Sequence, residues 1–437
     1  MSKVEVFMVV LLCYLMVFLS PTIEIVILFS SLTFLLVYSQ NILEDEFHLY
    51  YYIDDCAFYL ILMSLFLVML ITVLDFKSFL KRLMILLTLL IVLIFFCVSS
   101  LLVFFIFFEL MVIPLFCILI LYGTQPERIK ASRWMVLYTM VSSAPLLISL
   151  LFVMEYGYDH SGMIKMFMMI SNLSFNIELL VFLLLSFLVK IPMFFLHSWL
   201  PKAHVEAPLE GSMILAGVML KVGLYGMIRM ISIMPNLFYK SSLFYWLMGI
   251  SLVGSSLISW MALSSDDMKM SVAFSSISHM NFVMCGLMSM KIMGLLSSVL
   301  IMISHALCSC LLFFLVTEIY SKCHSRSILI SKGTFSMSPL YVLMNFIAWS
   351  MNMSIPPFIS FTAEILCSAS ILSILPFSIF LILLYIMLNS IYSLFNYGIQ
   401  SHSFSYIYIK TNNPSVSSLL ISFMFITPLL MMFFFEL

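Results

Sequence analysis

The chain has 437 residues, of which 64% are hydrophobic and only 9% are charged, and its formal net charge is −1. Soluble domains carry about 25% charged residues, so this composition is typical of a polytopic membrane protein and offers no basic surface to nucleic acid. The nine cysteines include no C-x-x-C pair, and no glycine-rich nucleotide motif is present. The sequence therefore argues against a disulfide framework and predicts no metal, flavin, NADH or iron–sulfur site in this chain.

Apolar runs of about 20 residues, the length that crosses a bilayer as a helix, follow one another along the whole chain. The run at 83–122 is interrupted only by Ser99-Ser100 and is long enough for two crossings, so we expect a helical hairpin there. The pattern predicts an all-α fold with about fourteen transmembrane helices, near residues 4–20, 22–38, 56–74, 83–98, 101–122, 133–154, 177–200, 207–231, 242–263, 270–289, 292–319, 339–371, 377–400 and 415–434.

The basic residues between the predicted helices fall into two sets, one for each face of the membrane. The richer face carries Lys77, Lys81, Arg82, Arg128, Lys130, Arg133, Lys202, Lys269, Lys322, Arg326, Lys332 and Lys410. The other face, which also has both chain ends, carries Lys3, Lys165, Arg229, Lys240 and Lys291. The positive-inside rule places the richer face on the inner side of the membrane, and we therefore expect both termini on the outer side.

Prolines interrupt two of the predicted helices. Pro192 has no N–H group and leaves the carbonyl of Leu188 unpaired, and Pro356-Pro357 stands near the middle of the long run 339–371. In a membrane, such freed backbone groups persist only where protein or a water-filled cavity receives them. We predict two broken helices, and a tight turn containing proline and histidine between the helices at 177–200 and 207–231.

The charged side chains deepest in the predicted spans are Glu109, Lys190, Lys221 and Glu364. A lysine at the centre of a transmembrane helix costs about 2.5–3.5 kcal/mol, and an isolated carboxylate in hydrocarbon needs a proton or a cation. These groups could load and release protons. They could also be static: an ion pair between helices, a lysine bonded to backbone carbonyls, and a carboxylate facing water near a helix end. The residues alone leave both interpretations open.

Two histidines lie in serine-containing spans, His279 in SSISHM and His305 in MISHALCS. Because imidazole titrates near neutral pH, each can relay a proton through water. Each can equally be a hydrogen-bonded packing residue. Their spacing has no metal-ligand pattern, so no metal site is expected.

Several motifs occur in the order of one known family. VKIPMFFLHSWLPKAHVEAP is followed by GSMILAGVMLKVGLYG; upstream stand FEL and YGTQPERIKASRWMVLYTMVSSAPL, and downstream SSISHMNFV, SHALCSCLLFFLVTEIYSKCHSR and IPPFISFTAE. Together they resemble the subunit-4 family of antiporter-like membrane subunits of NADH:ubiquinone oxidoreductase (respiratory complex I) and, more widely, Mrp-type cation/proton antiporters. The likeness covers about residues 100–370. In two departures from the pattern, Glu210 stands where a small residue is expected and Leu224 replaces a glycine.

The resemblance implies a core subunit of the membrane arm that moves protons from the matrix to the intermembrane space across the mitochondrial inner membrane. It also implies the residues of the proton path: Glu109, Lys190, Lys221, His305 and Glu364, with His279 as a weaker candidate. Glu109 would tune Lys190, Lys221 would bridge, and Glu364 would deliver the proton. Antiporter-like subunits 2 and 5 and membrane lipid, cardiolipin included, would be the neighbours. NADH, FMN, iron–sulfur clusters and ubiquinone would act elsewhere in the assembly.

Transporter folds often contain inverted repeats whose broken helices meet near the midplane of the membrane. The breaks at Pro192 and Pro357 are separated by an odd number of predicted helices, which gives two copies of opposite orientation. The predicted organisation has three N-terminal helices at 1–82, a first repeat at 83–231, a second repeat at 242–400 and a C-terminal helix at 401–437.

Two other functions stay open at this point. A separate Mrp-type cation/proton antiporter predicts the same buried charges. A non-pumping structural scaffold predicts that loss of Lys221 or Glu364 leaves transport intact.

Overall fold

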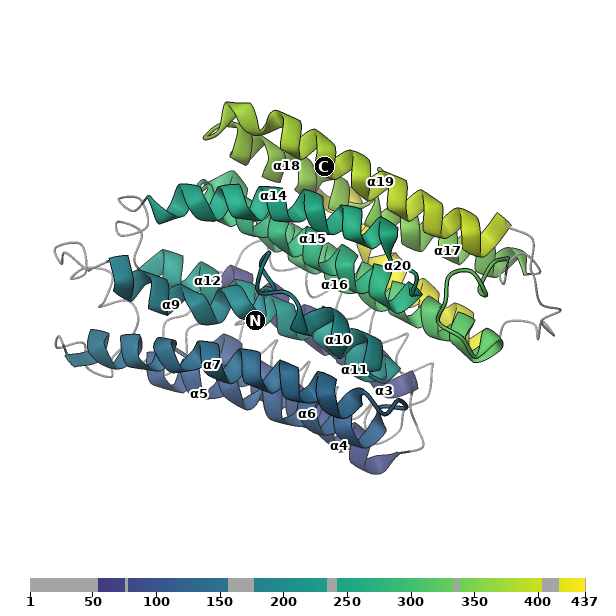
Figure 1. The fold of residues 1–437 in the computed structure, drawn as a ribbon, viewed down its shortest axis with the longest axis horizontal. Helices are drawn as coiled ribbons and strands as arrows, with labels where there is room; N and C mark the ends of the chain where they lie inside the picture. Colours follow the sequence, from purple (N-terminus) through teal and green to yellow (C-terminus); the bar gives the residue numbers. More distant parts are fainter. Residues whose placement is uncertain are drawn as a thin grey trace. The chain divides into compact units, whose positions relative to one another are not determined.

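The computed structural model describes residues 54–74, 78–155, 177–233, 242–333, 338–402 and 416–436. Within these ranges the chain is helical, with one isolated β-bridge between Asp267 and Ser327 and no β-strand (Figure 1). Nine of the described helices are long and apolar enough to cross a membrane. The all-helical, polytopic class is thus confirmed. The expected helices at 4–20 and 22–38 lie outside the described residues, so the total of fourteen stays a prediction.

The described residues form two compact units. The first comprises the residues up to Lys190 together with Glu206–Leu243, and the second comprises Ile191–Val205 and the residues from Phe244 onward. The chain therefore leaves the first unit directly after Lys190, where sequence analysis places a break. The inverted repeats expected at 83–231 and 242–400 stay a prediction.

The first unit begins with a helical hairpin, which confirms the expectation for residues 83–122, because Ser99-Ser100 separate the two arms. Its second arm is divided in turn: Pro114 has no N–H to donate to the carbonyl of Leu110, and a helix ends there. The helices of this unit are α3 (Asp55–Leu74), α4 (Phe79–Cys97), α5 (Leu101–Leu110), α6 (Val112–Tyr122), α7 (Arg128–Glu155), α9 (Ile177–Lys190), α11 (Leu209–Ile214), the π-helical η2 (Leu215–Met219) and α12 (Leu220–Ile233).

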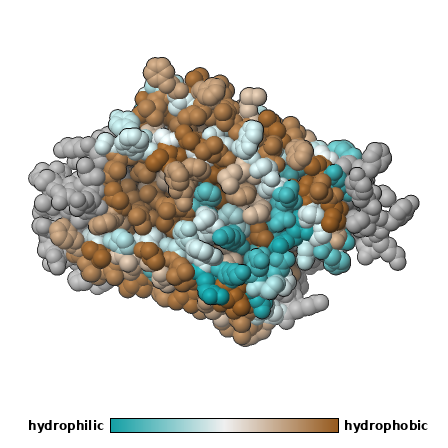
Figure 2. Space-filling model, viewed as in Figure 1, coloured by the Kyte–Doolittle hydropathy of each residue, from teal (hydrophilic) through white to brown (hydrophobic). Residues whose placement is uncertain are grey.

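The second unit is built around one long helix, α16 (Ile292–Cys323), whose central part is almost wholly buried and which packs against α15, α17, α18 and α20. The other helices are α10 (Trp199–Glu206), α14 (Leu243–Ser264), α15 (Met268–Met288), α17 (Pro339–Asn352), α18 (Ile359–Leu372), the short 3₁₀ turn η3 (Pro376–Ser378), α19 (Ile379–His402) and α20 (Val416–Glu436). On its outer surface α19 exposes Phe380, Leu383 and Met387. The face drawn in Figure 2 is coloured mainly hydrophobic, as expected where side chains meet lipid.

Both predicted helix breaks are confirmed. The chain is non-helical at 191–198, between α9 and α10, and again at 353–358, between α17 and α18. The expected turn at 201–206 is wrong, because Pro201 and His204 lie inside α10. Pro201 falls in the first turn of that helix, where backbone N–H groups have no partner within the helix and a proline costs nothing extra.

Arg229 does not lie in a loop, as its place among the loop charges implied. It lies within α12 and is 1% exposed. Its guanidinium donates to the carbonyl of Val98 at 2.6 Å and to the hydroxyl of Tyr225 at 2.6 Å, and it pairs with Asp54 at 3.5 Å. Tyr225 lies on the same helix, Val98 directly follows α4, and Asp54 directly precedes α3. A charge that looks interfacial in sequence is therefore neutralised inside the first unit.

Candidate functional site

Lys190 and Glu109 meet inside the first unit. Lys190 is the last residue of α9 and is 3% exposed, because the Pro192 break ends the helix just after it. Its Nζ lies 3.8 Å from Oε1 of Glu109, donates a hydrogen bond to the carbonyl of Phe108, and lies 3.1 Å from the centre of the Phe108 ring. The predicted pairing of these two charges is thus present in the structure.

The surroundings of this pair are aromatic. The Phe108 ring packs against Phe104 at 6.4 Å and against Phe187 at 5.2 Å between ring centres. Glu109 lies one residue before the end of α5, beside the interruption that Pro114 imposes. Such an apolar lining keeps the local dielectric low, so the attraction between ammonium and carboxylate is much stronger here than in water.

Asn281, on α15 in the second unit, holds the non-helical segment that follows Lys190. Its Oδ1 accepts a hydrogen bond from the backbone N–H of Phe194 at 3.2 Å, and its Nδ2 lies 3.4 Å from the carbonyl of Pro192. A second bond, 2.8 Å long, joins Nδ2 to the carbonyl of Ile277 within α15. One side-chain amide therefore supplies both a donor and an acceptor to backbone groups that no helix satisfies.

Lys221 lies two residues after the π-helical turn η2 and is 2% exposed. Its Nζ donates to the carbonyl of Ala216, which lies within that turn. In a π-turn the backbone bonds run from residue i to i+5, and such turns are frequent at functional sites. The wide turn presents a carbonyl to the ammonium group, so a lysine in the middle of the continuous helical segment 209–233 is solvated by its own backbone.

A second cluster lies in the second unit around His279 of α15. Its Nδ1 is 2.9 Å from the hydroxyl of Tyr385 and 3.5 Å from Oε1 of Glu364, and its Nε2 is 3.3 Å from Oδ1 of Asn352. Both imidazole nitrogens thus face polar partners. These partners lie on α17, α18 and α19, and His279 itself lies on α15. A histidine placed in this way can accept a proton at one nitrogen and release one from the other.

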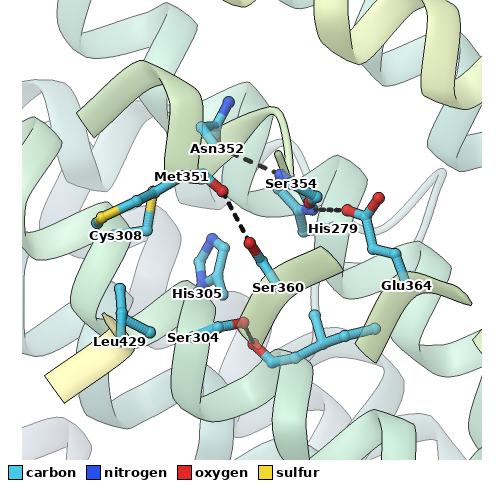
Figure 3. Close-up of a pocket in the computed structure, with 11 residues that line it drawn as sticks. His279, Ser304, His305, Cys308, Met351, Asn352, Ser354, Ser360, Glu364 and Leu429 are labelled. Carbon is cyan, nitrogen blue, oxygen red and sulfur yellow. Dashed lines mark hydrogen bonds and ion pairs between the residues drawn. The ribbon is translucent and has the colours of Figure 1, made fainter. Parts of the chain in front are cut away.

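A small cavity joins this cluster to His305 (Figure 3). The His305 and His279 rings lie 5.6 Å apart between centres, and Glu364, Ser304 and Ser354 also line the space. The cavity measures about 20 Å³ as the space open to the centre of a water molecule. About 10–15 Å³ by this measure holds one water, and the site has enough polar partners to bind it.

Comparison with known proteins identifies the family. The family model described as NADH:quinone oxidoreductase/Mrp antiporter, TM, matches residues 98–391. The chain belongs to this family. NADH-ubiquinone oxidoreductase chain 4 of Mytilus edulis is 36% identical over 73% of this chain and 72% of the relative.

Other relatives agree on the family. The chain 4 protein of Aedes aegypti is 42% identical over 61% of this chain, and the match spans 59% of that relative's length. A chain in the solved structure of respiratory complex I from Thermus thermophilus with bound NADH matches with a TM-score of 0.84 at 22% identity, covering 98% of this chain and 95% of that one. At that identity the structural match establishes the fold.

In this member of the family, the structure brings the sequence candidates into two groups. Glu109 and Lys190 meet in the first unit, where Lys221 lies separately on α12, and His279, His305 and Glu364 surround the cavity of the second unit. His279, the weaker candidate in sequence, makes the direct contact with Glu364.

Sequence reasoning missed Tyr385, Asn352 and Asn281. A signal for Tyr385 was present, because polar residues recur every three or four positions along the otherwise apolar run 379–402. Asn352 and Asn281 are single amides, and only the packing of distant helices reveals their partners.

Proposed function

We propose that this chain is a proton-translocating core subunit in the membrane arm of respiratory complex I, in the mitochondrial inner membrane. It would move protons from the matrix to the intermembrane space, driven by electron transfer from NADH to ubiquinone elsewhere in the assembly. The observation that carries the proposal is the Lys190–Glu109 pair: a buried ammonium and carboxylate, 3.8 Å apart, at the point where a membrane helix is broken. Buried ionisable groups in membrane spans mark ion and proton paths by default.

The mechanism follows from the chemistry of each group. While Glu109 stays beside Lys190, it stabilises the charged lysine; when the two separate, an apolar site favours the neutral amine, and Lys190 releases its proton. Lys221 would accept that proton, and the Ala216 carbonyl would accept a hydrogen bond from the charged ammonium group. In the second unit, His305 and His279 would pass a proton through cavity water to Glu364, which would deliver it.

The partners of this function would be other complex I subunits, in particular the antiporter-like subunits 2 and 5, with membrane lipid, cardiolipin included, between them. The enzyme activity, NADH:ubiquinone reductase coupled to proton translocation, belongs to the assembly, whose NADH, FMN, iron–sulfur and quinone sites would lie in other chains. The positive-inside rule favours both termini on the intermembrane-space side.

The test is the number of protons pumped per NADH oxidised in sealed membranes that carry Lys221→Ala in the assembled complex. We expect pumping and coupled activity to collapse while the amount of assembled complex stays normal. Lys291→Ala is the matched control, because Lys291 is an exposed lysine at the start of α16.

The same experiment separates the alternatives. Normal pumping in Lys221→Ala would overturn the relay and support a structural scaffold. Proton exchange that requires sodium or another cation but no NADH would favour an Mrp-type antiporter.

A further inference from the structure

The buried side of α19 is polar, although the helix is otherwise apolar. Its buried residues include Tyr385, Asn389, Tyr392, Asn396 and Gln400, which recur every three or four positions and so lie on one helix face. The opposite face exposes apolar side chains. Packing alone does not require this pattern, since membrane helices pack well through small or apolar residues.

A matching set of residues on α17 faces this side of α19, and the two helices pack together (Figure 1). Asn345, Trp349 and Asn352 are spaced i, i+4 and i+7 along α17. Asn352 Nδ2 donates to the hydroxyl of Tyr392 at 2.9 Å, and Trp349 Nε1 donates to Oε1 of Gln400 at 3.2 Å. We call Asn345, Asn352, Asn389, Asn396 and Gln400 the amide column.

One end of the amide column reaches the histidine cluster. Asn352 lies 3.3 Å from Nε2 of His279 and also lines the cavity that holds His305 and Glu364 (Figure 3). Asn389 Nδ2 donates to the backbone carbonyl of Asn352 at 3.1 Å, so the next amide along α19 is fixed to the same point.

The other end of the amide column reaches one end of the second unit. Gln400 Nε2 lies 3.7 Å from the sulfur of Met268, the first residue of α15. The backbone at Ile399, next to Gln400, is hydrogen-bonded to the loop after α16. Gly333 N donates to the carbonyl of Ile399 at 3.0 Å. Lys269 and Lys332 lie in these segments, so the positive-inside rule places this end on the matrix side.

Three atoms of the amide column lack the partners that buried amides need. Among the described residues, neither Nδ2 nor Oδ1 of Asn345 has a hydrogen-bond partner, and Oδ1 of Asn389 has none either. Asn345 is 1% exposed and Asn389 2% exposed. Buried polar groups of this kind are normally satisfied by ordered water when protein does not supply the bond.

We propose that the amide column holds a file of water that carries protons between the matrix-side end of the second unit and the His279–Glu364 cavity. The inference rests on the proposed function and adds a second route for protons, which enters the second unit directly from the matrix side. We call this route the branch. Amide side chains orient the waters without being protonated themselves. Each water accepts one proton and releases another, so one proton enters at Gln400, one arrives at His279, and nothing else is consumed.

The test replaces the two amides that have unpartnered atoms with apolar groups of similar size, Asn345→Leu and Asn389→Leu, in the intact complex. A purely structural role predicts unchanged pumping in Asn345→Leu, because that side chain has no hydrogen-bond partner among the described residues. For Asn389→Leu it predicts only a small loss of stability, because the bond from Nδ2 to the carbonyl of Asn352 is removed. A water file predicts a loss of about fivefold in protons pumped per NADH oxidised, with normal assembly and unimpaired resistance to thermal inactivation. Met387→Leu is the matched control, because Met387 lies on the exposed face of the same helix.

A second pair of variants keeps the test decisive if leucine disturbs packing. Asn345→Ser and Asn389→Ser retain a polar group and leave room for a further water, so we expect them to restore most of the pumping. Two results would show that the branch is wrong. One is normal pumping in the leucine variants, and the other is pumping that the serine variants fail to restore.

Lys221→Ala, measured in the same membranes, separates this result from failure of the proposed function. If Lys221→Ala abolishes pumping while both leucine variants pump normally, the function stands and the branch is wrong. If Lys221→Ala also pumps normally, the function and the branch fall together.

Discussion

The two units solve the problem of a buried carboxylate in different ways. In the first unit, Glu109 faces an ammonium group 3.8 Å away, among phenylalanine rings. In the second unit, Glu364 faces His279 at 3.5 Å beside a cavity with room for water and among neutral polar groups. One carboxylate is held by a lysine ammonium group, and the other by an imidazole, which is a much weaker base.

Under the proposed function, this difference separates two tasks in proton translocation. In an apolar site the energy of an ion pair depends steeply on distance, so a small movement of the chain changes which groups are charged. In a hydrated site with an imidazole, protons can pass without a large movement, because water and histidine exchange them readily. The first unit is suited to sensing a conformational change, and the second to conducting the proton.

The largest effect is expected from Lys190→Ala, which removes the cation that faces Glu109 in the first unit. Proton pumping should fall by a factor of about 100, the lower range for losing a proton-transfer group. The stability of the unit should fall by about 3–5 kcal/mol, because Glu109 is left buried without its cation. Pumping per NADH oxidised and resistance to thermal inactivation measure the two effects.

The double variant Lys190→Ala with Glu109→Ala sharpens this result. Without the lone carboxylate, the stability should recover while pumping stays low. Recovery of pumping along with stability would mean that the pair only holds two helices together, and the contrast between the units would lose its basis.

The next largest effect is expected from Glu364→Gln, which keeps the size of the side chain and removes its charge. Pumping should fall by less than the factor of about 100 expected for loss of a general acid, because the cavity beside Glu364 has room for water that can still pass protons. His279→Ala should cost less than Glu364→Gln, because the enlarged cavity admits more water beside Glu364. Equal losses in the two variants would show that imidazole, and not cavity water, carries the proton to Glu364. Pumping and quinone reduction are measured in parallel for both.

A smaller effect is expected from packing beside Lys190. Gly226 of α12 lies against Phe187 of α9, and an added methyl group would collide with that ring. Gly226→Ala should destabilise the first unit by about 1–3 kcal/mol, as overpacking does, and disturb the helix turn before Lys190. Gly249→Ala is the matched control, since among the described residues no atom outside the neighbouring helix backbone lies within 4 Å of the added methyl group. The temperature of half-inactivation of the complex should drop for the first variant only.

Sequence reasoning recovers those features whose cause is local. Pro192 and Pro357 break their helices because proline lacks an N–H group, and buried charges stand out because hydrocarbon penalises them. Contacts that depend on how helices are rotated against each other are not visible in this way. His279 faces Glu364, and Arg229 is neutralised by Asp54 and the Val98 carbonyl, only because distant segments pack together.

The smallest stated effect on proton pumping is expected from Asn281→Ala, which tests how the Lys190 break and the His279 cluster are coupled. Asn281 lies on the same helix as His279, and its amide holds the backbone at Pro192 and Phe194, just after the chain leaves Lys190. Asn281→Ala removes three hydrogen bonds, each worth about 1 kcal/mol, so the free energy of unfolding should drop by up to about 3 kcal/mol and pumping should fall a few-fold. Ser276→Ala is the control, because it removes a bond of similar kind, to the carbonyl of Ala273, that stays within α15. If pumping falls only in Asn281→Ala, α15 transmits movement of the non-helical segment 191–198 to the cluster of His279 and Glu364. If both variants pump alike, the Asn281 amide serves stability alone. The segment and the cluster must then be coupled by another route.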